Sequence, residues 1–312
     1  MKKKAKKKFK FEEVFLRIVT WTAAGLTCGV LLYIVGFILV KGIPHLTPAL
    51  FAPVYNSENV SLLPALVSTC IVIALSLAIA FPLGLFAAIY LAEYARRGSP
   101  VVSLIRLMTE TLSGIPSIVY GLFGLLFFVT FLRMGFSVLA GTCTLSIMIL
   151  PLIIRSAEEA LRSVPDSYRE GSFALGAGRL RTVFAVVLPA AARGIAAGVM
   201  LSIGRITGET AALIYTAGTV ARIPGSPMQS ARTLSVHMYA LSGEGLHVNE
   251  GYATAVVLLA VVILINFASA ALTGSIGKTR ETSGTLRSRR SPRWVIKALP
   301  ERAASPLWEE LG

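Results

Sequence analysis

Two charged residues interrupt a long apolar run, and their chemistry suits an anion. Arg205 and Glu209 stand in the apolar stretch from Leu188 to Thr216, and Thr207 and Thr210 add hydroxyl groups beside them. A guanidinium group binds the oxygens of an oxyanion through paired hydrogen bonds. On one continuous helix Arg205 and Glu209 are a turn apart and share a face, so Glu209 can orient the guanidinium or accept a proton from the anion. The pattern predicts an oxyanion path; the alternative is a structural ion pair.

The depth of Arg205 in the apolar stretch supports a role inside a membrane. Arg205 lies 16 residues beyond Pro189, which is roughly 24 Å along a helix. A charge at that depth costs a few kcal/mol, so its side chain has to face protein or water. Arg before Glu is the weaker order for supporting a helix. Local helix stability therefore explains the pair poorly.

A second pair of charges, Arg106 and Glu110, repeats the four-residue spacing before another apolar run. We interpret Arg106 as an anchor at the membrane interface, whereas Glu110 lies one turn deeper. Ser113 and Ser117 follow and can line a path on that face, although a packing role explains these small residues equally well. Glu110, Ser113 and Ser117 are the additional candidates for the path.

Composition places the chain in a membrane. The sequence has 312 residues, of which 54% are hydrophobic and 15% charged, with a mean hydropathy of +0.71. A spanning helix needs about 20 apolar residues. Five uninterrupted runs are long enough, and the stretch with Arg205 makes a sixth; the five are Ile18–Val40, Leu62–Leu91, Thr111–Leu132, Met134–Ile154 and Gly251–Gly277. We therefore predict an all-α integral membrane protein with six transmembrane helices.

The formal net charge of +14 is mainly an orientation signal. If the N-terminus is cytoplasmic, the predicted inner segments hold 24 Lys and Arg residues and the outer segments hold four: Lys41, Arg133, Arg222 and Arg232. Such a bias sets the topology of membrane proteins. We expect a multi-pass protein of the bacterial plasma membrane with both termini cytoplasmic, no nucleic-acid partner, and N-terminal lysines that touch anionic lipid.

Other chemistries have little support in the sequence. The segment 274–279 is similar to a phosphate-binding loop, but Leu272 stands where the leading glycine belongs and the segment follows a membrane span. The three cysteines lie in apolar runs without metal-ligand spacing, and the three histidines, His45, His237 and His247, are interpreted as solvated loop residues. We predict no catalytic residue, no metal and no cofactor.

The polar loop from residue 155 to 188, called the coupling loop below, carries a spaced pattern. Ser163-Val-Pro-Asp166 predicts a helix start with a hydroxyl cap, and small residues along the next turns allow close approach of a partner. The helix is expected to weaken near Gly176. The residues expected to contact or support a partner are Arg169, Glu170, Gly171, Ser172, Gly176, Leu188 and Pro189.

These segments resemble the membrane permeases of ABC importers, most closely the A-type subunit of the phosphate-specific importers. The general importer pattern is Glu-Ala-Ala, three residues, Gly, nine residues and Ile-x-Leu-Pro; Gly171, Ser172 and Val186 replace Ala, Ala and Ile. The narrower matches are Ser113-Gly-Ile-Pro-Ser117, Leu150 to Glu170, and Gly204-Arg-Ile-Thr-Gly-Glu-Thr210. The resemblance covers roughly residues 62 to 272.

The resemblance implies a type I ABC importer permease fold. It also implies that the protein imports inorganic phosphate by alternating access. Its implied partners are a sister permease, two ATP-binding subunits and an external phosphate-binding protein. The ATP-binding subunits hydrolyse the ATP, so this chain is not expected to be an enzyme. We divide the chain into a basic N-terminus (1–17), a first helix with an external segment (18–61), the permease domain (62–272) and a basic, disordered tail (273–312). The alternatives are a permease for sulfate or molybdate, and a carrier or channel that needs no ATPase.

Overall fold

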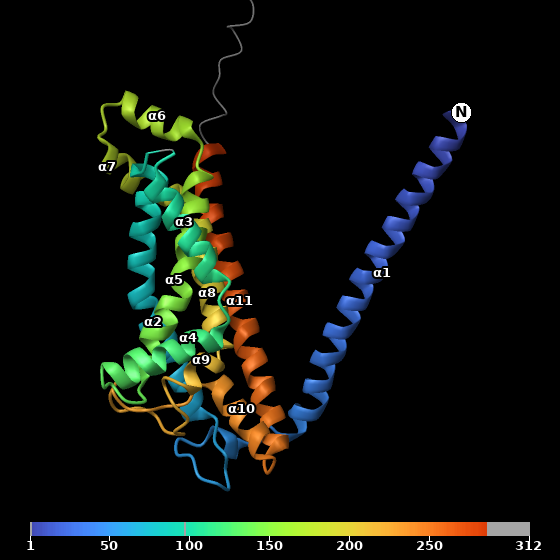
Figure 1. Cartoon of the computed structure of the whole chain (residues 1–312), viewed down its shortest axis with the longest axis vertical. Coiled ribbons are helices and arrows are strands. Elements are labelled where there is room, and N and C mark those ends of the chain that lie inside the picture. The colour runs from blue at the N-terminus through green and yellow to red at the C-terminus, as the bar shows by residue number, and fades with distance from the viewer. Residues whose placement is uncertain (1, 97, 286–312) are drawn as a thin grey trace, which may run out of the picture.

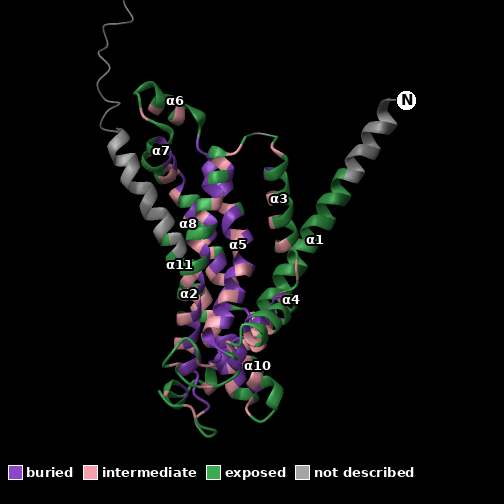
Figure 2. Cartoon of the chain, turned by 60° about the vertical axis from the view of Figure 1, so that its left-hand side comes forward, coloured by how far each residue is buried: buried purple, intermediate pink, exposed green. Residues whose placement is uncertain are grey.

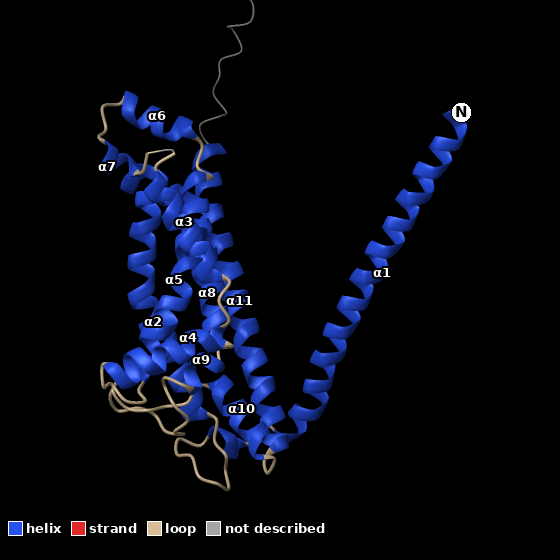
Figure 3. Cartoon of the chain, in the orientation of Figure 1, coloured by secondary structure: helices blue, strands red, loops and turns tan. Residues whose placement is uncertain are grey.

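The computed structural model describes residues 2–96 and 98–285, and in these ranges every regular element is helical (Figure 3). Five helices are long and apolar enough to cross a membrane. These spans fall on α1 (Lys2–Gly42), α2 (Leu63–Ile89), α5 (Val138–Arg162), α8 (Leu188–Thr207) and α11 (Val248–Thr285). A bent pair of helices makes the sixth if it counts as one span. The prediction of an all-α membrane protein is confirmed.

The break of the bent pair lies within the apolar run from Thr111 to Leu132, which we expected to form a single spanning helix. The structure divides it into α3 (Pro100–Ser113) and α4 (Ser117–Gly124), which continues as a π-helical segment, Leu125–Phe131. The two parts are bent by 99°. Pro116 has no backbone N–H and disfavours helical geometry at the preceding residue, which separates the two parts. The Tyr120 hydroxyl donates to the Leu112 carbonyl at 2.7 Å and satisfies a group that the break exposes.

The centre of the bundle consists of α2, α5 and α8, and burial is concentrated along α5 (Figure 2). Leu145, Met148 and Ile149 of α5 are at most 1% exposed. Glycines bring the helices close: a Cβ on Gly84 of α2 would lie 2.7 Å from the Ile153 side chain, and one on Gly194 of α8 would lie 2.6 Å from that of Ala160. Small residues at such contacts let membrane helices pack backbone to backbone.

Helix α1 leans away from this bundle and meets it near the beginning of α11 (Figure 1). The side chains from Glu13 to Tyr33 are exposed. Gly42 marks the contact, since a Cβ there would collide with the backbone of Tyr252. Two 3₁₀ turns, Ile43–His45 and Pro48–Phe51, lead from α1 to α2.

The shorter elements gather at opposite ends of the bundle (Figure 1). One end holds α6 (Asp166–Ala174) and α7 (Arg179–Thr182), with a π-helical segment, Val183–Val187, before α8. The other holds α4, α9 (Ala211–Ile214) and α10 (Leu234–Glu244). A third π-helical segment, Tyr90–Tyr94, ends α2.

Helix α11 continues through Thr285, into the segment for which we expected a disordered tail. No proline follows Gly277 until Pro292, so nothing in the sequence forces an earlier end. Residues 286–312 of the predicted tail lie outside the described residues.

Candidate functional site

The coupling loop folds into two short helices joined by a glycine turn. Helix α6 begins at Asp166 with Pro165 in the cap position. Ser163 is instead the C-terminal cap of α5, and its hydroxyl donates to the Ala160 carbonyl at 2.8 Å. The expected hydroxyl cap at Ser163 is therefore wrong, because the chain turns at Pro165. Helix α6 ends as predicted: Gly176 has a φ of +80°, a conformation that favours glycine. Pro189 occupies the first turn of α8.

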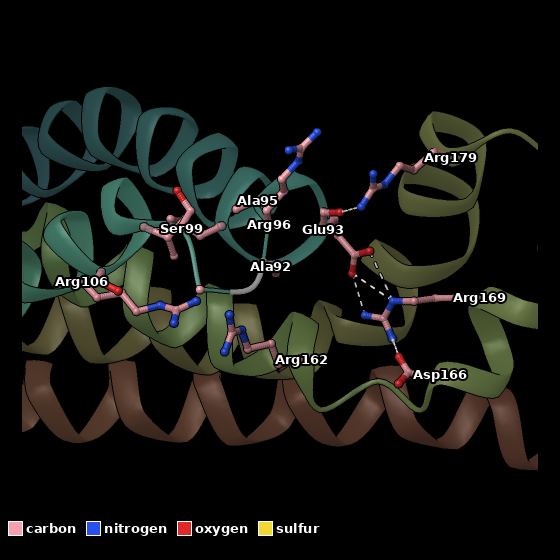
Figure 4. A pocket seen from close by; sticks show the side chains of 14 residues that line it. Ala92, Glu93, Ala95, Arg96, Ser99, Arg106, Arg162, Asp166, Arg169 and Arg179 are labelled. Atoms are coloured by element: carbon pink, nitrogen blue, oxygen red, sulfur yellow. Dashed lines mark hydrogen bonds and ion pairs between the residues drawn. The ribbon is translucent and has the colours of Figure 1, made fainter.

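Arg169 turns back into the protein and is only 16% exposed (Figure 4). Its Nη2 atom lies 2.6 Å from Oε1 of Glu93, which is 8% exposed at the end of α2. Further hydrogen bonds reach the carbonyls of Val164 at 2.7 Å and Leu161 at 2.9 Å. The hydrogen bond to Glu93 raises the pKa of Arg169. Arg169 thus fastens the coupling loop to α2, and its expected role in contacting or supporting a partner protein stays a prediction.

The outer face of α6 is exposed. Glu170 and Gly171 are exposed, and nothing lies within 4 Å of a Cβ built on Gly171. Exposed apolar side chains flank them, with Tyr168 52%, Phe173 47% and Leu175 90% exposed. Apolar side chains beside small residues are typical of a protein-binding surface.

Two of the predicted coupling residues serve the packing of the loop itself. The Ser172 hydroxyl lies 2.9 Å from that of Thr182, and Leu188 packs against the buried cluster that includes Leu161 and Val187. These contacts hold α6 against the segment leading into α8. The outward surface of the loop is thus formed by Glu170, Gly171 and the apolar residues beside them.

Arg205 lies in the last turn of α8 and is half-buried. Within the described ranges, the structure records no ion pair to its guanidinium. Glu209 lies beyond the helix, which Gly208 terminates, and its Oε1 atom accepts a hydrogen bond from the Ala212 N–H at 3.2 Å. The expectation that Arg205 and Glu209 share a helix face is therefore wrong. Glu209 caps α9 and is 8% exposed.

The hydroxyl groups near this break differ in availability. Thr207 is buried and donates to the Ile203 carbonyl at 2.7 Å, so its proton is already used. Thr210 is half-buried with a long contact of 3.4 Å to the Gly208 carbonyl. The exposed Ser113 donates to the carbonyl of the exposed Glu110 at 2.7 Å, at the end of α3, and Ser117 begins α4.

The break between α3 and α4 and the break between α8 and α9 lie next to each other in the structure. Helix α4 packs against α9, and a Cβ on Gly121 would lie 2.9 Å from the Ala212 Cα atom. Helix α10 joins them through the Ser235 hydroxyl, which donates to the Glu209 carbonyl at 2.7 Å. Irregular backbone inside membranes occurs where it is buried in protein or lines a water-filled cavity, and broken helices commonly build transport sites.

Two residues near this junction had escaped the sequence reasoning. Arg232, which we counted only as an external charge, is 5% exposed; its guanidinium carbon lies 4.7 Å from the centre of the Tyr55 ring. No carboxylate pairs with it among the described residues, and its Nε atom has no hydrogen-bond partner there. Burying a cation in this way is costly without a compensating charge. The sequence carries no periodic signal for this burial.

His237, which we interpreted as solvated, is fully buried in α10. Burial, followed by the nearby charge of Arg232, lowers the pKa of His237 to about 4. The imidazole is therefore neutral at pH 7. Among the described residues, no group of three or more His, Cys, Asp or Glu side chains lies close enough to hold a metal ion.

Curated relatives of this chain are membrane subunits of transporters. It is 37% identical over 188 residues to the probable ABC transporter permease protein YqgI of Bacillus subtilis, covering 56% of this chain and 64% of the relative. It is 38% identical over 190 residues to the phosphate transport system permease protein PstA of Yersinia pestis, covering 60% and 63%. This chain therefore spans slightly less than two thirds of each of these relatives.

Solved structures agree on the fold. A bacterial ABC transporter for the import of alginate, in complex with its periplasmic protein, aligns with a TM-score of 0.54 at 20% identity, over 80% of this chain and 94% of the other. The inward-facing MetNI methionine ABC transporter aligns with a TM-score of 0.52 at 21% identity, over 68% and 93%. The family described as binding-protein-dependent transport system inner membrane component matches residues 80–279. The chain therefore belongs to this family and is a membrane-embedded transport subunit.

Proposed function

We propose that this chain is the permease subunit of an ATP-driven importer for inorganic phosphate. The observation that carries the proposal is Arg205, a half-buried guanidinium at the end of a membrane helix with no carboxylate paired to it among the described residues. The likeness to the PstA permease of Yersinia pestis supports phosphate as the anion. A guanidinium offers paired donors that fit phosphate oxygens.

Glu209 provides a basis for selecting phosphate over sulfate. Phosphate still carries a proton near neutral pH, and a carboxylate can accept a hydrogen bond from it, whereas the sulfate dianion offers no proton. Glu209 is 8% exposed, and its Oε1 atom is held by the Ala212 N–H, which leaves further lone pairs on the carboxylate. The role of Glu209 is then to recognise the protonated face of the anion.

The path is proposed to follow the two interruptions of the spans. Arg232 and Thr210 supply donors on the side of α10, and Arg205 receives the anion at the end of α8. Ser117, Ser113 and Glu110 flank the break between α3 and α4, and Thr207 supports the end of α8 by its bond to Ile203. The N-terminal end of α4, which begins at Ser117, carries a partial positive charge that favours an anion at this break.

Coupling is proposed to act through α6. An ATP-binding subunit docks on the surface of Glu170 and Gly171, and its movement is transmitted to α2 through the pair of Arg169 and Glu93. Two such subunits, a sister permease and an external phosphate-binding protein complete the assembly. In Figure 1 the N-terminal end of α1 and helix α6 lie at the same end of the molecule. Together with the bias of basic residues, this favours a cytoplasmic N-terminus and coupling loop, and we propose the same side for the C-terminus.

The decisive experiment is purification of the complex from bacterial membranes, with identification of its subunits and measurement of ATP hydrolysis. Hydrolysis stimulated by the phosphate-loaded binding protein, and phosphate uptake that unlabelled phosphate but not sulfate or molybdate competes away, are the expected results. Uptake competed equally by sulfate would identify another oxyanion permease. Uptake that survives ATP depletion and follows the membrane potential would identify a carrier instead.

Docking on α6 is tested by Glu170→Lys, which reverses an exposed charge on the proposed surface. The variant should lose its co-purifying ATP-binding subunit while still inserting into the membrane. Glu159→Lys is the matched control, because Glu159 is also exposed and, in the part of the chain that the structure describes, its ion pair is with Arg155 on α5. Retention of the ATP-binding subunit by Glu170→Lys would contradict docking at this surface.

A further inference from the structure

A polar cavity of about 610 Å³ lies between the bundle and the coupling loop. Its walls come from the end of α2, the beginning of α3, the end of α5 and the helices α6 and α7 (Figure 4). We call it the arginine cavity because five arginines line it: Arg96, Arg106, Arg162, Arg169 and Arg179. The proposed path for the transported anion is at the other end of the bundle, so this cavity is separate from it.

Positive charge exceeds negative charge in the arginine cavity. Glu93 and Asp166 are the acidic residues in its lining, and both bind Arg169. Arg179 donates to the backbone carbonyl of Glu93 and stacks on the Tyr94 ring, with its guanidinium carbon 5.0 Å from the ring centre. In the part of the cavity nearest the coupling loop, Arg169 and Arg179 are therefore already bound by groups of the protein itself.

The excess charge lies at the opposite end, between Arg106 and Arg162. Both guanidinium groups bind the same oxygen, Oε1 of Glu158, at 2.8 and 3.0 Å. One carboxylate thus serves two cations, which leaves one positive charge uncompensated and several N–H donors unused. In Figure 4 the two side chains extend toward one another, while Arg96 extends away from them. Their side chains are 42% and 49% exposed, so a ligand can reach them.

Helix α3 adds neutral donors on the same side. Ser99, Ser103 and Arg106 follow at spacings of four and three residues, which places them on one helix face toward the cavity. In the described part of the chain, the hydroxyls of Ser99 and Ser103 make no recorded hydrogen bond. Ser99 also leaves the first-turn N–H groups without a side-chain cap. Free N–H groups at a helix start attract anions.

We propose that the arginine cavity binds a phosphate group, carried either by an anionic phospholipid or by inorganic phosphate. Arg106 and Arg162 supply charge-assisted hydrogen bonds, and Ser99 and Ser103 supply hydroxyl donors. The opposite face of α3 exposes Val101, Leu104 and Met108, which are 56%, 51% and 55% exposed and suit contact with acyl chains. A phosphate bound here connects α3 with the end of α5. Because Arg169 and Arg179 of the coupling loop line the same cavity, this connection makes the attachment of the coupling loop more rigid.

The test uses the full-length chain in detergent, stripped of lipid, with Arg205→Gln as background to weaken phosphate binding in the transport path. Thermal unfolding is followed during titration with phosphatidylglycerol, with phosphatidylcholine or with inorganic phosphate. We expect phosphatidylglycerol or inorganic phosphate to raise the melting temperature, and phosphatidylcholine to have no effect. The effective titrant identifies the source of the phosphate group. An absence of stabilisation by both anions would overturn the proposal.

Variants locate the site. Arg106→Gln and Arg162→Gln should each raise the apparent dissociation constant about tenfold or more, since each removes charge-assisted bonds. Ser103→Ala leaves every ion pair intact and should raise it a few-fold, which covers the case in which an arginine variant fails to fold. The matched control is Arg155→Gln, because Arg155 is an exposed arginine of α5 that does not line the cavity. Equal affinities in the control and in all cavity variants would refute the site.

A third outcome separates the cavity from a protein-binding surface. If Arg106→Gln or Arg162→Gln loses a co-purifying ATP-binding subunit without any change in anion affinity, the cavity receives an acidic side chain of that subunit and the proposal is wrong. This inference does not depend on the transported substrate. Failure of the phosphate-uptake experiment leaves the titration result unaffected, so the two proposals are tested separately.

Discussion

Arg169 of the coupling loop and Glu93 at the end of α2 form the tightest ion pair recorded for the described residues, with 2.6 Å between Nη2 and Oε1. The two residues are 76 positions apart in the chain. We predict that Arg169→Gln leaves ATP hydrolysis in place and lowers uptake at least tenfold, because the loop no longer pulls on α2. Removing one partner of a buried pair costs about 3 kcal/mol. Parallel measurement of uptake and hydrolysis checks this.

The pair itself is isolated by a double-mutant comparison. Glu93→Gln should resemble Arg169→Gln, whereas the double variant should recover part of the lost stability, because no unpaired buried charge remains. Asp166→Asn is the control; the Asp166 side chain is 74% exposed, and its pair with Arg169 should contribute less than about 1 kcal/mol. Strictly additive losses in the double variant would show that the pair does not act as a unit.

Arg205→Gln is expected to abolish phosphate uptake while membrane insertion and association with an ATP-binding subunit persist. Arg205→Lys should retain a small part of the uptake, because an ammonium group keeps the charge but loses the paired geometry. The matched control is Arg193→Gln, an exposed arginine on the same helix. Normal transport by Arg205→Gln would mean that the guanidinium is structural.

Gly121→Ala is predicted to loosen the contact between α4 and α9. Its added methyl group would lie 2.9 Å from the Ala212 Cα atom, and backbone cannot move aside as a side-chain tip can. Overpacking of this kind costs about 1–3 kcal/mol. Gly204→Ala on α8 serves as the control, because nothing lies within 4 Å of a Cβ at that position. Thermal unfolding in detergent compares the two variants, and equal melting temperatures would contradict a tight junction.

Acid should destabilise the protein through His237. The pKa of this histidine is lowered from 6.5 to about 4 in the folded state, so below pH 6.5 the unfolded chain binds a proton that the folded chain does not. Stability is therefore full above pH 6.5 and declines as the pH falls toward 4, by up to about 3 kcal/mol. His237→Phe should flatten this dependence. The free energy of unfolding is measured between pH 4.5 and 7.5 for the wild type and for His237→Phe. If it depends on pH equally steeply in both, the loss of stability in acid comes from other groups.

The residues of the coupling loop illustrate what local sequence can predict. The spacing from Glu170 to Pro189 and the glycine at 176 placed a short helix, a turn and the start of a span in the observed order. The apolar runs likewise predicted the spans, because an unbroken hydrophobic stretch has few alternatives in a bilayer. The side-chain direction of Arg169 was not predictable, because Glu93 lies far away in the chain.

The sequence by itself determined the membrane class and the position of the short helix α6, since these depend on composition and local spacing. The orientation remains a prediction from the distribution of basic residues. Tertiary structure decided the rest. It set the 99° bend after α3, the end of α8 before Glu209, and the burial of Arg232 and His237. The physical reason is that the burial and pairing of a charge depend on which distant helix packs against it, and that packing has no signature within a single segment.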